Sequence, residues 1–234
     1  LRPSGASGPI AASLARFARY QRESAWTWEH LALTRARVVA GDAALGRRVE
    51  AAVAAVLRLP RDPGALVVDV AEMRRRIAHE HPHPPPLDLR HRRGGLVDLE
   101  FITQYLMLRE AARLPQVLCR DIGGAVAALG AAGVLAPQDA QLLGEAVTLL
   151  RAARVFLTLL FDGTPDADTL AGPPGATLAR CAGAVDFARL DADISAACAG
   201  VLACYDRLVA EPARQALRSR DSAAAERKEG GMAK

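Results

Sequence analysis

Two neighbouring glycines, Gly94 and Gly95, stand directly before an apolar stretch that predicts a helix over residues 96 to about 113. Glycine permits close backbone approach, and a helix N-terminus attracts anions, so we expect this turn to approach phosphate or nucleotide. Asp98 and Glu100 fall in the first helical turn. Because they are two residues apart, they point to different sides and are expected to hold neighbouring elements rather than share a metal. The open alternative is that both merely favour the helix dipole.

A second block, ESAWTWEHLALTRARVVAG at residues 23–41, places one glutamate and two arginines off the apolar stripe of a predicted helix. Guanidinium groups pair readily with phosphate oxygens. We therefore expect Arg35 and Arg37 to approach nucleotide or phosphate, and Glu29 to orient an arginine. The alternative is an ordinary amphipathic helix with packed tryptophans and solvated arginines.

Other chemistry has weaker support. Four histidines lie close together in the sequence: His79, His81, His83 and His91. The prolines around residues 82–86 separate their side chains, and no acidic or cysteine ligand accompanies them at regular spacing, which argues against a metal site. The basic run at residues 74–76 is typical of the solvated face of a helix. Neither a nucleophile elbow nor a P-loop is present. We predict no catalytic residue and no metal ligand in this chain.

The elements that must position these residues are helices, because apolar residues recur at three-to-four spacing almost throughout. We predict an all-α bundle of roughly seven to nine helices. Loops are expected over residues 81–95 and 162–175. The helices are expected from Leu14 after the cap Ser13, over 24–40, from Asp42 through Val56, over 66–77, over 96–113, over 122–129, from Pro137 to Leu160, and over 190–208.

Composition sets further bounds on the protein class. The 234 residues are 51% hydrophobic and 24% charged, which excludes wholesale disorder, and no apolar run reaches membrane-spanning length. The net charge of +4 is carried almost entirely by arginine, and aromatics are only 4%. We therefore expect no nucleic-acid partner and no membrane partner. The four cysteines lack ligand spacing, which predicts a reducing, cytoplasmic location.

Three motifs occur in a characteristic order: LRPSG at residues 1–5, AWTWEHLALTRARVVAGD at 25–42, and DLR followed by GGLVDLEFITQYL at 94–106. Together they resemble the C-terminal part of bacterial glutamate-ammonia ligase adenylyltransferases. The resemblance covers roughly residues 1–160 and fades through the last helices. This family adenylylates glutamine synthetase and, in a separate half, removes the adenylyl group. Arg90 departs from the family's usual lysine, which puts a phosphate contact there in doubt.

The resemblance implies a two-part catalytic unit. A nucleotidyltransferase domain of the polymerase-β type holds Mg²⁺ and ATP with a Gly-Ser turn and aspartates, and an all-helical domain follows and closes over it. Because the last metal-binding aspartate precedes LRPSG in the family, we expect this fragment alone to transfer nothing and to bind neither cofactor tightly. We assign residues 1–12 to the end of the upstream domain, 13–210 to the helical domain and 211–234 to a disordered tail.

The implied partners are glutamine synthetase, a PII-type signal protein and the upstream nucleotidyltransferase domain. In the intact enzyme, AMP would pass from ATP to a tyrosine of glutamine synthetase. The alternative from another class is a non-catalytic helical module that binds the PII-type protein or glutamine synthetase. Coding sequence upstream of Leu1 separates the two: an in-frame Gly-Ser turn with paired aspartates favours the enzyme, and an in-frame stop codon favours the module.

Overall fold

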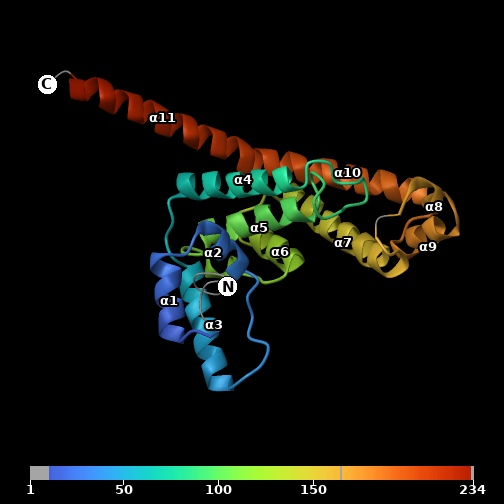
Figure 1. Cartoon of the computed structure of the whole chain (residues 1–234), viewed down its shortest axis with the longest axis horizontal. Coiled ribbons are helices and arrows are strands. Elements are labelled where there is room, and N and C mark those ends of the chain that lie inside the picture. The colour runs from blue at the N-terminus through green and yellow to red at the C-terminus, as the bar shows by residue number, and fades with distance from the viewer. Residues whose placement is uncertain (1–10, 164, 233–234) are drawn as a thin grey trace.

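A computed structural model describes residues 11–163 and 165–232, and every regular element within these ranges is helical (Figure 1). This confirms the predicted all-α bundle. Residues 1–10, assigned from the sequence to the end of an upstream domain, lie outside the described residues. The elements are α1 (Leu14–Glu23), α2 (Thr27–Leu33), α3 (Ala43–Leu57), α4 (Pro63–Glu80), α5 (Leu96–Glu110), η2 (Pro115–Val117), α6 (Ile122–Ala131), α7 (Pro137–Leu160), α8 (Ala167–Ala171), α9 (Pro173–Cys181), α10 (Phe187–Tyr205), η3 (Asp206–Ala210) and α11 (Glu211–Met232).

Helix α5 is the centre of the bundle, because α2, α4, α6, α7 and α10 all pack against it. Its side chains are buried on nearly every face; Leu99, Ile102 and Leu106 are completely inaccessible to solvent. A helix that is apolar all round is typical of such a central position. Helix α5 is therefore a rigid base for the carboxylates in its first turn.

Side-chain caps begin the surrounding helices where the sequence predicts them. The Ser13 hydroxyl accepts the Arg16 N–H at the start of α1, and the Asp42 carboxylate accepts the Leu45 N–H at the start of α3. Each cap satisfies an N–H group that the helix itself leaves without a partner. None of the described helices combines the length and apolarity needed to cross a lipid bilayer.

Helix α2 is much shorter than the predicted helix over residues 24–40, which is a correction. The last turn tightens, since the Thr34 hydroxyl and N–H both donate to the Leu31 carbonyl. Beyond it, the Val38 N–H donates to the Glu50 carboxylate of α3, 3.2 Å away, instead of continuing the helix. The Glu50 side chain thus holds the segment around Val38 in a non-helical path, and the β-branched residues of this segment have low helix propensity. Arg35 and Arg37 consequently lie after α2, not on it.

The C-terminal segment also differs from prediction, because helix α11 occupies residues 211–232, where the sequence predicted a tail. Figure 1 shows α10 and α11 following one another in a long line, with α11 above α4. Pro212 stands in the first turn of α11, where a proline is tolerated. Ala213 is buried, and Ala216 approaches Gly64 of α4 closely. Small residues on both helices let them pack, although the apolar stripe on α11 is weak.

The predicted loop over residues 162–175 is likewise partly helical. Asp166 caps the short helix α8 by accepting the Thr169 N–H, and Pro173 begins α9 directly afterwards. Proline favours loops in sequence patterns but also suits the first position of a helix. This second use explains the difference.

Candidate functional site

The carboxylate of Asp98 is completely buried and accepts four hydrogen bonds from neighbouring elements. Arg74 of α4 donates from Nε at 2.6 Å and from Nη2 at 3.3 Å. Arg93 donates from Nη1 at 3.2 Å, and the backbone N–H of Gly94 donates at 2.6 Å. Asp98 therefore ties α4, the glycine turn and α5 together.

Arg74 corrects the prediction that the basic run at residues 74–76 is a solvated face. Arg75 and Arg76 are exposed, but Arg74 is 1% exposed and faces Asp98. The sequence did contain a signal, because Arg74 lies four residues after the buried Val70 on the apolar side of α4. A charged residue at a core position implies a buried partner of opposite charge.

The two glycines have a packing task that differs from the predicted phosphate approach. Gly94 has φ +76°, and a Cβ on it would overlap the backbone carbonyl of Cys198 in α10. A Cβ on Gly95 would lie 2.6 Å from the carbonyl oxygen of Leu89. Both positions thus require glycine so that chain segments can meet.

The amides of this turn are also already in use. The Gly95 N–H donates to the Arg92 carbonyl, the Leu96 N–H to the Leu89 carbonyl, and the Val97 N–H to the Arg90 carbonyl. A helix N-terminus binds anions through N–H groups without partners, and these have partners within the chain. The glycine turn therefore joins α5 to α10. A nucleotide contact at Gly94 or Gly95 stays a prediction.

The two sequence blocks meet at Glu100, on the side of α5 away from the Asp98 cluster. Nη1 of Arg35 lies 2.9 Å from Oε1 of Glu100, and Nη1 of Arg90 lies 3.9 Å from the same oxygen. Glu100 is largely buried, whereas the side chains of Arg35 and Arg90 are 51% and 38% exposed. Asp98 and Glu100 hold different elements. Two exposed guanidinium groups beside one buried carboxylate keep donors available for an anion.

Glu29 and Arg37 lie apart from this pairing. Glu29 is buried, and its carboxylate accepts hydrogen bonds from the Tyr20 hydroxyl at 3.0 Å and from the Trp26 N–H at 2.9 Å. It therefore joins α1 to the start of α2, and the expectation that it orients an arginine is corrected. Arg37 is exposed and lines a groove of about 210 Å³ with Phe17 and Glu50.

The tryptophans form an exposed surface that sequence reasoning missed. Trp26 is 71% exposed and Trp28 is 47% exposed, although packed tryptophans were the expectation for an ordinary amphipathic helix. They border a small cleft with Asp69 and Met73 of α4. Exposed tryptophans are typical of surfaces that contact another protein or domain.

The histidine group makes local contacts. The rings of His81 and His91 stack 3.9 Å apart, and Nδ1 of His91 lies 2.9 Å from the Asp88 carboxylate. Among residues 11–163 and 165–232, no group of three or more His, Cys, Asp or Glu side chains is arranged to hold a metal ion.

Two protein-family models match different parts of the chain. A family model described as glutamate-ammonia ligase adenylyltransferase matches residues 1–52, and one described as GlnD PII-uridylyltransferase matches residues 68–201. A curated protein of Xanthobacter autotrophicus is 41% identical over 209 residues, covering 89% of this chain and 21% of the relative. One of Bradyrhizobium sp. is 42% identical over 192 residues, covering 82% and 20%. Both are described as bifunctional glutamine synthetase adenylyltransferase/adenylyl-removing enzymes, and the chain spans about a fifth of their length.

Proposed function

The chain belongs to the family of bifunctional glutamine synthetase adenylyltransferase/adenylyl-removing enzymes, and from this premise we propose that it forms the helical part of the half that adenylylates. In the whole enzyme, AMP would pass from ATP to a tyrosine hydroxyl of glutamine synthetase and so regulate nitrogen assimilation in the cytoplasm. The observation that carries the proposal is the 41% identity across 89% of the chain. The direct Arg35–Glu100 contact between the two motif blocks supports it.

We place the binding of Mg²⁺ and ATP in the upstream nucleotidyltransferase domain. The carboxylates of Asp98 and Glu100 do not fit a magnesium site, since each is engaged by guanidinium groups. In the whole enzyme the helices would close over the bound nucleotide. Arg35 would then donate to phosphate oxygens, and Glu100 would hold its side chain in place.

A first test uses a fusion of the upstream part of the Xanthobacter relative to this chain. We expect Arg35→Ala to lower AMP incorporation into glutamine synthetase about tenfold, the loss expected for one charge-assisted contact to phosphate. Arg113→Ala is the matched control, because Arg113 is also exposed and paired with a glutamate, Glu110. If Arg35→Ala and Arg37→Ala both leave the rate unchanged, the phosphate assignment is wrong.

A second test concerns the exposed tryptophans, which we propose contact the upstream domain. Replacing both Trp26 and Trp28 by alanine should lower the stability of the isolated chain by about 2–3 kcal/mol, because Trp26 is 71% exposed and Trp28 is 47% exposed, so only part of each side chain is buried. In the fusion, the same change should lower AMP transfer about tenfold through the lost contact. Val185→Ala, at a 91% exposed position, is the control. An unchanged rate in the double variant would place the domain contact elsewhere.

A second candidate function is a non-catalytic module that binds a PII-type signal protein. The match to the PII-uridylyltransferase model over residues 68–201 favours it. Calorimetric titration of the isolated chain with a PII protein tests this candidate. Saturable binding would support it, and no heat beyond dilution would count against it.

A further inference from the structure

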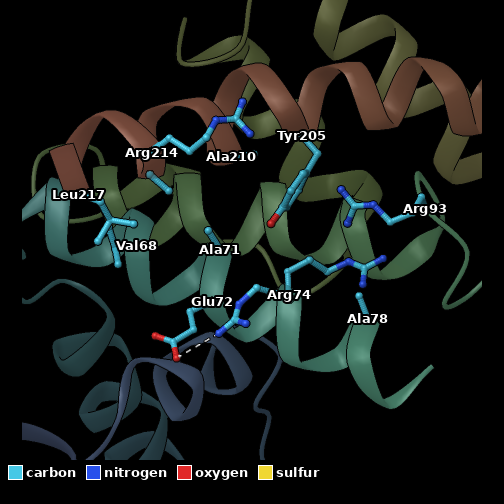
Figure 2. Close-up of a pocket in the computed structure, with 12 residues that line it drawn as sticks. Val68, Ala71, Glu72, Arg74, Ala78, Arg93, Tyr205, Ala210, Arg214 and Leu217 are labelled. Carbon is cyan, nitrogen blue, oxygen red and sulfur yellow. Dashed lines mark ion pairs between the residues drawn. The ribbon is translucent and has the colours of Figure 1, made fainter. Parts of the chain in front are cut away.

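A cavity of about 630 Å³ lies between α4, η3 and α11, and it is separate from the Arg35–Glu100 pairing. Its volume is within the range typical of small-molecule sites. Most of its wall is apolar, but arginines from three different segments line it. In Figure 2, Arg74, Arg93 and Tyr205 lie near one end of the cavity, and Val68 and Leu217 near the other.

The buried guanidinium of Arg74 has a donor without an acceptor. Its Nε and Nη2 donate to Asp98, and Nη2 also reaches the His91 carbonyl at 3.3 Å. Within the described residues, Nη1 has no hydrogen-bond partner, although it is buried. Leaving a charged donor unsatisfied in the interior is costly, so an acceptor is expected there.

Further donors line the cavity. Nη2 of Arg93 lies 3.9 Å from Asp206, and Nη2 of Arg75 lies 3.9 Å from Glu72, both beyond hydrogen-bonding distance. Burial raises the pKa of Tyr205 to about 12, and the negative charge of Asp98 contributes, so its hydroxyl keeps its proton. The Arg93 guanidinium lies 5.0 Å from the centre of the Tyr205 ring and holds it in place.

Directly after Tyr205, the helix is interrupted by the π-helical turn η3. Such turns are rare, and they occur frequently at functional sites. Here the turn brings Ala210 and the first residues of α11 to the cavity wall. The π-helical turn thus forms part of the cavity wall directly after the Tyr205 donor.

We propose that this cavity binds a small organic oxyanion, a phosphate or a carboxylate. The charged group would accept hydrogen bonds from Arg93 and the Tyr205 hydroxyl, while the carbon body lies against the apolar wall. Carboxylates already balance much of the positive charge: Glu72, Asp98, Asp206 and Glu211. Selection would therefore depend on directed donors, which favour planar or tetrahedral oxygen groups over simple anions such as chloride.

Thermal unfolding of the full chain tests the proposal, with inorganic phosphate and, separately, succinate as probes at constant ionic strength set by KCl. A ligand that binds only the folded state raises Tm in a saturable way. A saturable rise with phosphate identifies a phosphate ligand, and a rise with succinate identifies a carboxylate ligand. If neither probe raises Tm above the KCl series, the proposal is overturned.

Two variants locate the binding. Tyr205→Phe and Arg93→Gln each remove one of the proposed donors, and each should raise the Kd of the active probe about fivefold. Arg189→Gln is the matched control, because Arg189 is also exposed and pairs with Asp193 on α10, outside the cavity lining. The control should keep the Kd of the original protein. Equal Kd values in all three variants would mean that the anion binds elsewhere, which also overturns the proposal.

Discussion

Replacing Asp98 by alanine is expected to lower the free energy of unfolding by about 3–5 kcal/mol, because it leaves a buried cation without its partner. The side chain of Asp98 is 0% exposed and that of its partner Arg74 is 1% exposed, so water cannot take over the role of the carboxylate. The Gly94 N–H and one Arg93 N–H lose their acceptor as well. Urea unfolding followed by circular dichroism measures the change.

The matched control is Asp193→Ala, which breaks the Arg189–Asp193 pair on an exposed face of α10. Exposed pairs of this kind contribute within about 1 kcal/mol. A double variant, Arg74→Met with Asp98→Leu, should recover much of the loss, since it removes both buried charges. An Asp98→Ala cost no larger than that of Asp193→Ala would refute the structural role given to this carboxylate.

The second large effect is expected for Gly94→Ala, which should destabilise the fold by about 3–5 kcal/mol through steric overlap and backbone strain together. The new Cβ would meet the backbone carbonyl of Cys198, and the backbone of α10 cannot move aside as a flexible side chain could. The positive φ of +76° adds strain for any residue with a Cβ. Urea unfolding again gives the measurement.

Gly183→Ala separates the two causes. Gly183 has a similar φ of +83°, but nothing lies within 4 Å of the position that a Cβ would take there. It should therefore cost only about 1–2 kcal/mol, the strain part alone. Equal losses for the two variants would mean that the close approach of α5 and α10 contributes nothing.

The helices that could be predicted from the sequence are those whose signals are local. Ser13 and Asp42 act as caps within three residues of the N–H groups that they accept, and the apolar stripes of α4 and α10 lie on one chain segment each. Periodicity and capping act over such short distances, so the sequence alone carries them.

Three of the errors share a different cause, because each depends on a partner far along the chain. Glu50 holds the extended path after α2 by binding Val38, and α4 supplies the surface on which α11 packs. The neighbouring arginines of the 74–76 run are alike in sequence, but only Arg74 faces Asp98, 24 residues away. Local sequence patterns cannot predict such contacts between distant residues.

The candidate site was predictable in its residues but not in its pairings. Arg35 and Glu100 were both singled out, yet their contact bridges 65 positions and required the packing of α2 on α5. The glycine pair was recognised as a close-approach turn, but its neighbour is the α10 backbone. Sequence identifies unusual residues, whereas their partners emerge only from the fold.

We propose that these helices complete a catalytic unit whose metal-bearing part lies upstream. The most direct measurement is incorporation of labelled AMP into glutamine synthetase, with Mg²⁺ and ATP, by three proteins: this chain, the upstream part of the Xanthobacter relative, and their fusion. We predict transfer by the fusion, none by this chain, and much slower transfer by the upstream part. Transfer by this chain alone, or an upstream part as fast as the fusion, would contradict the claim.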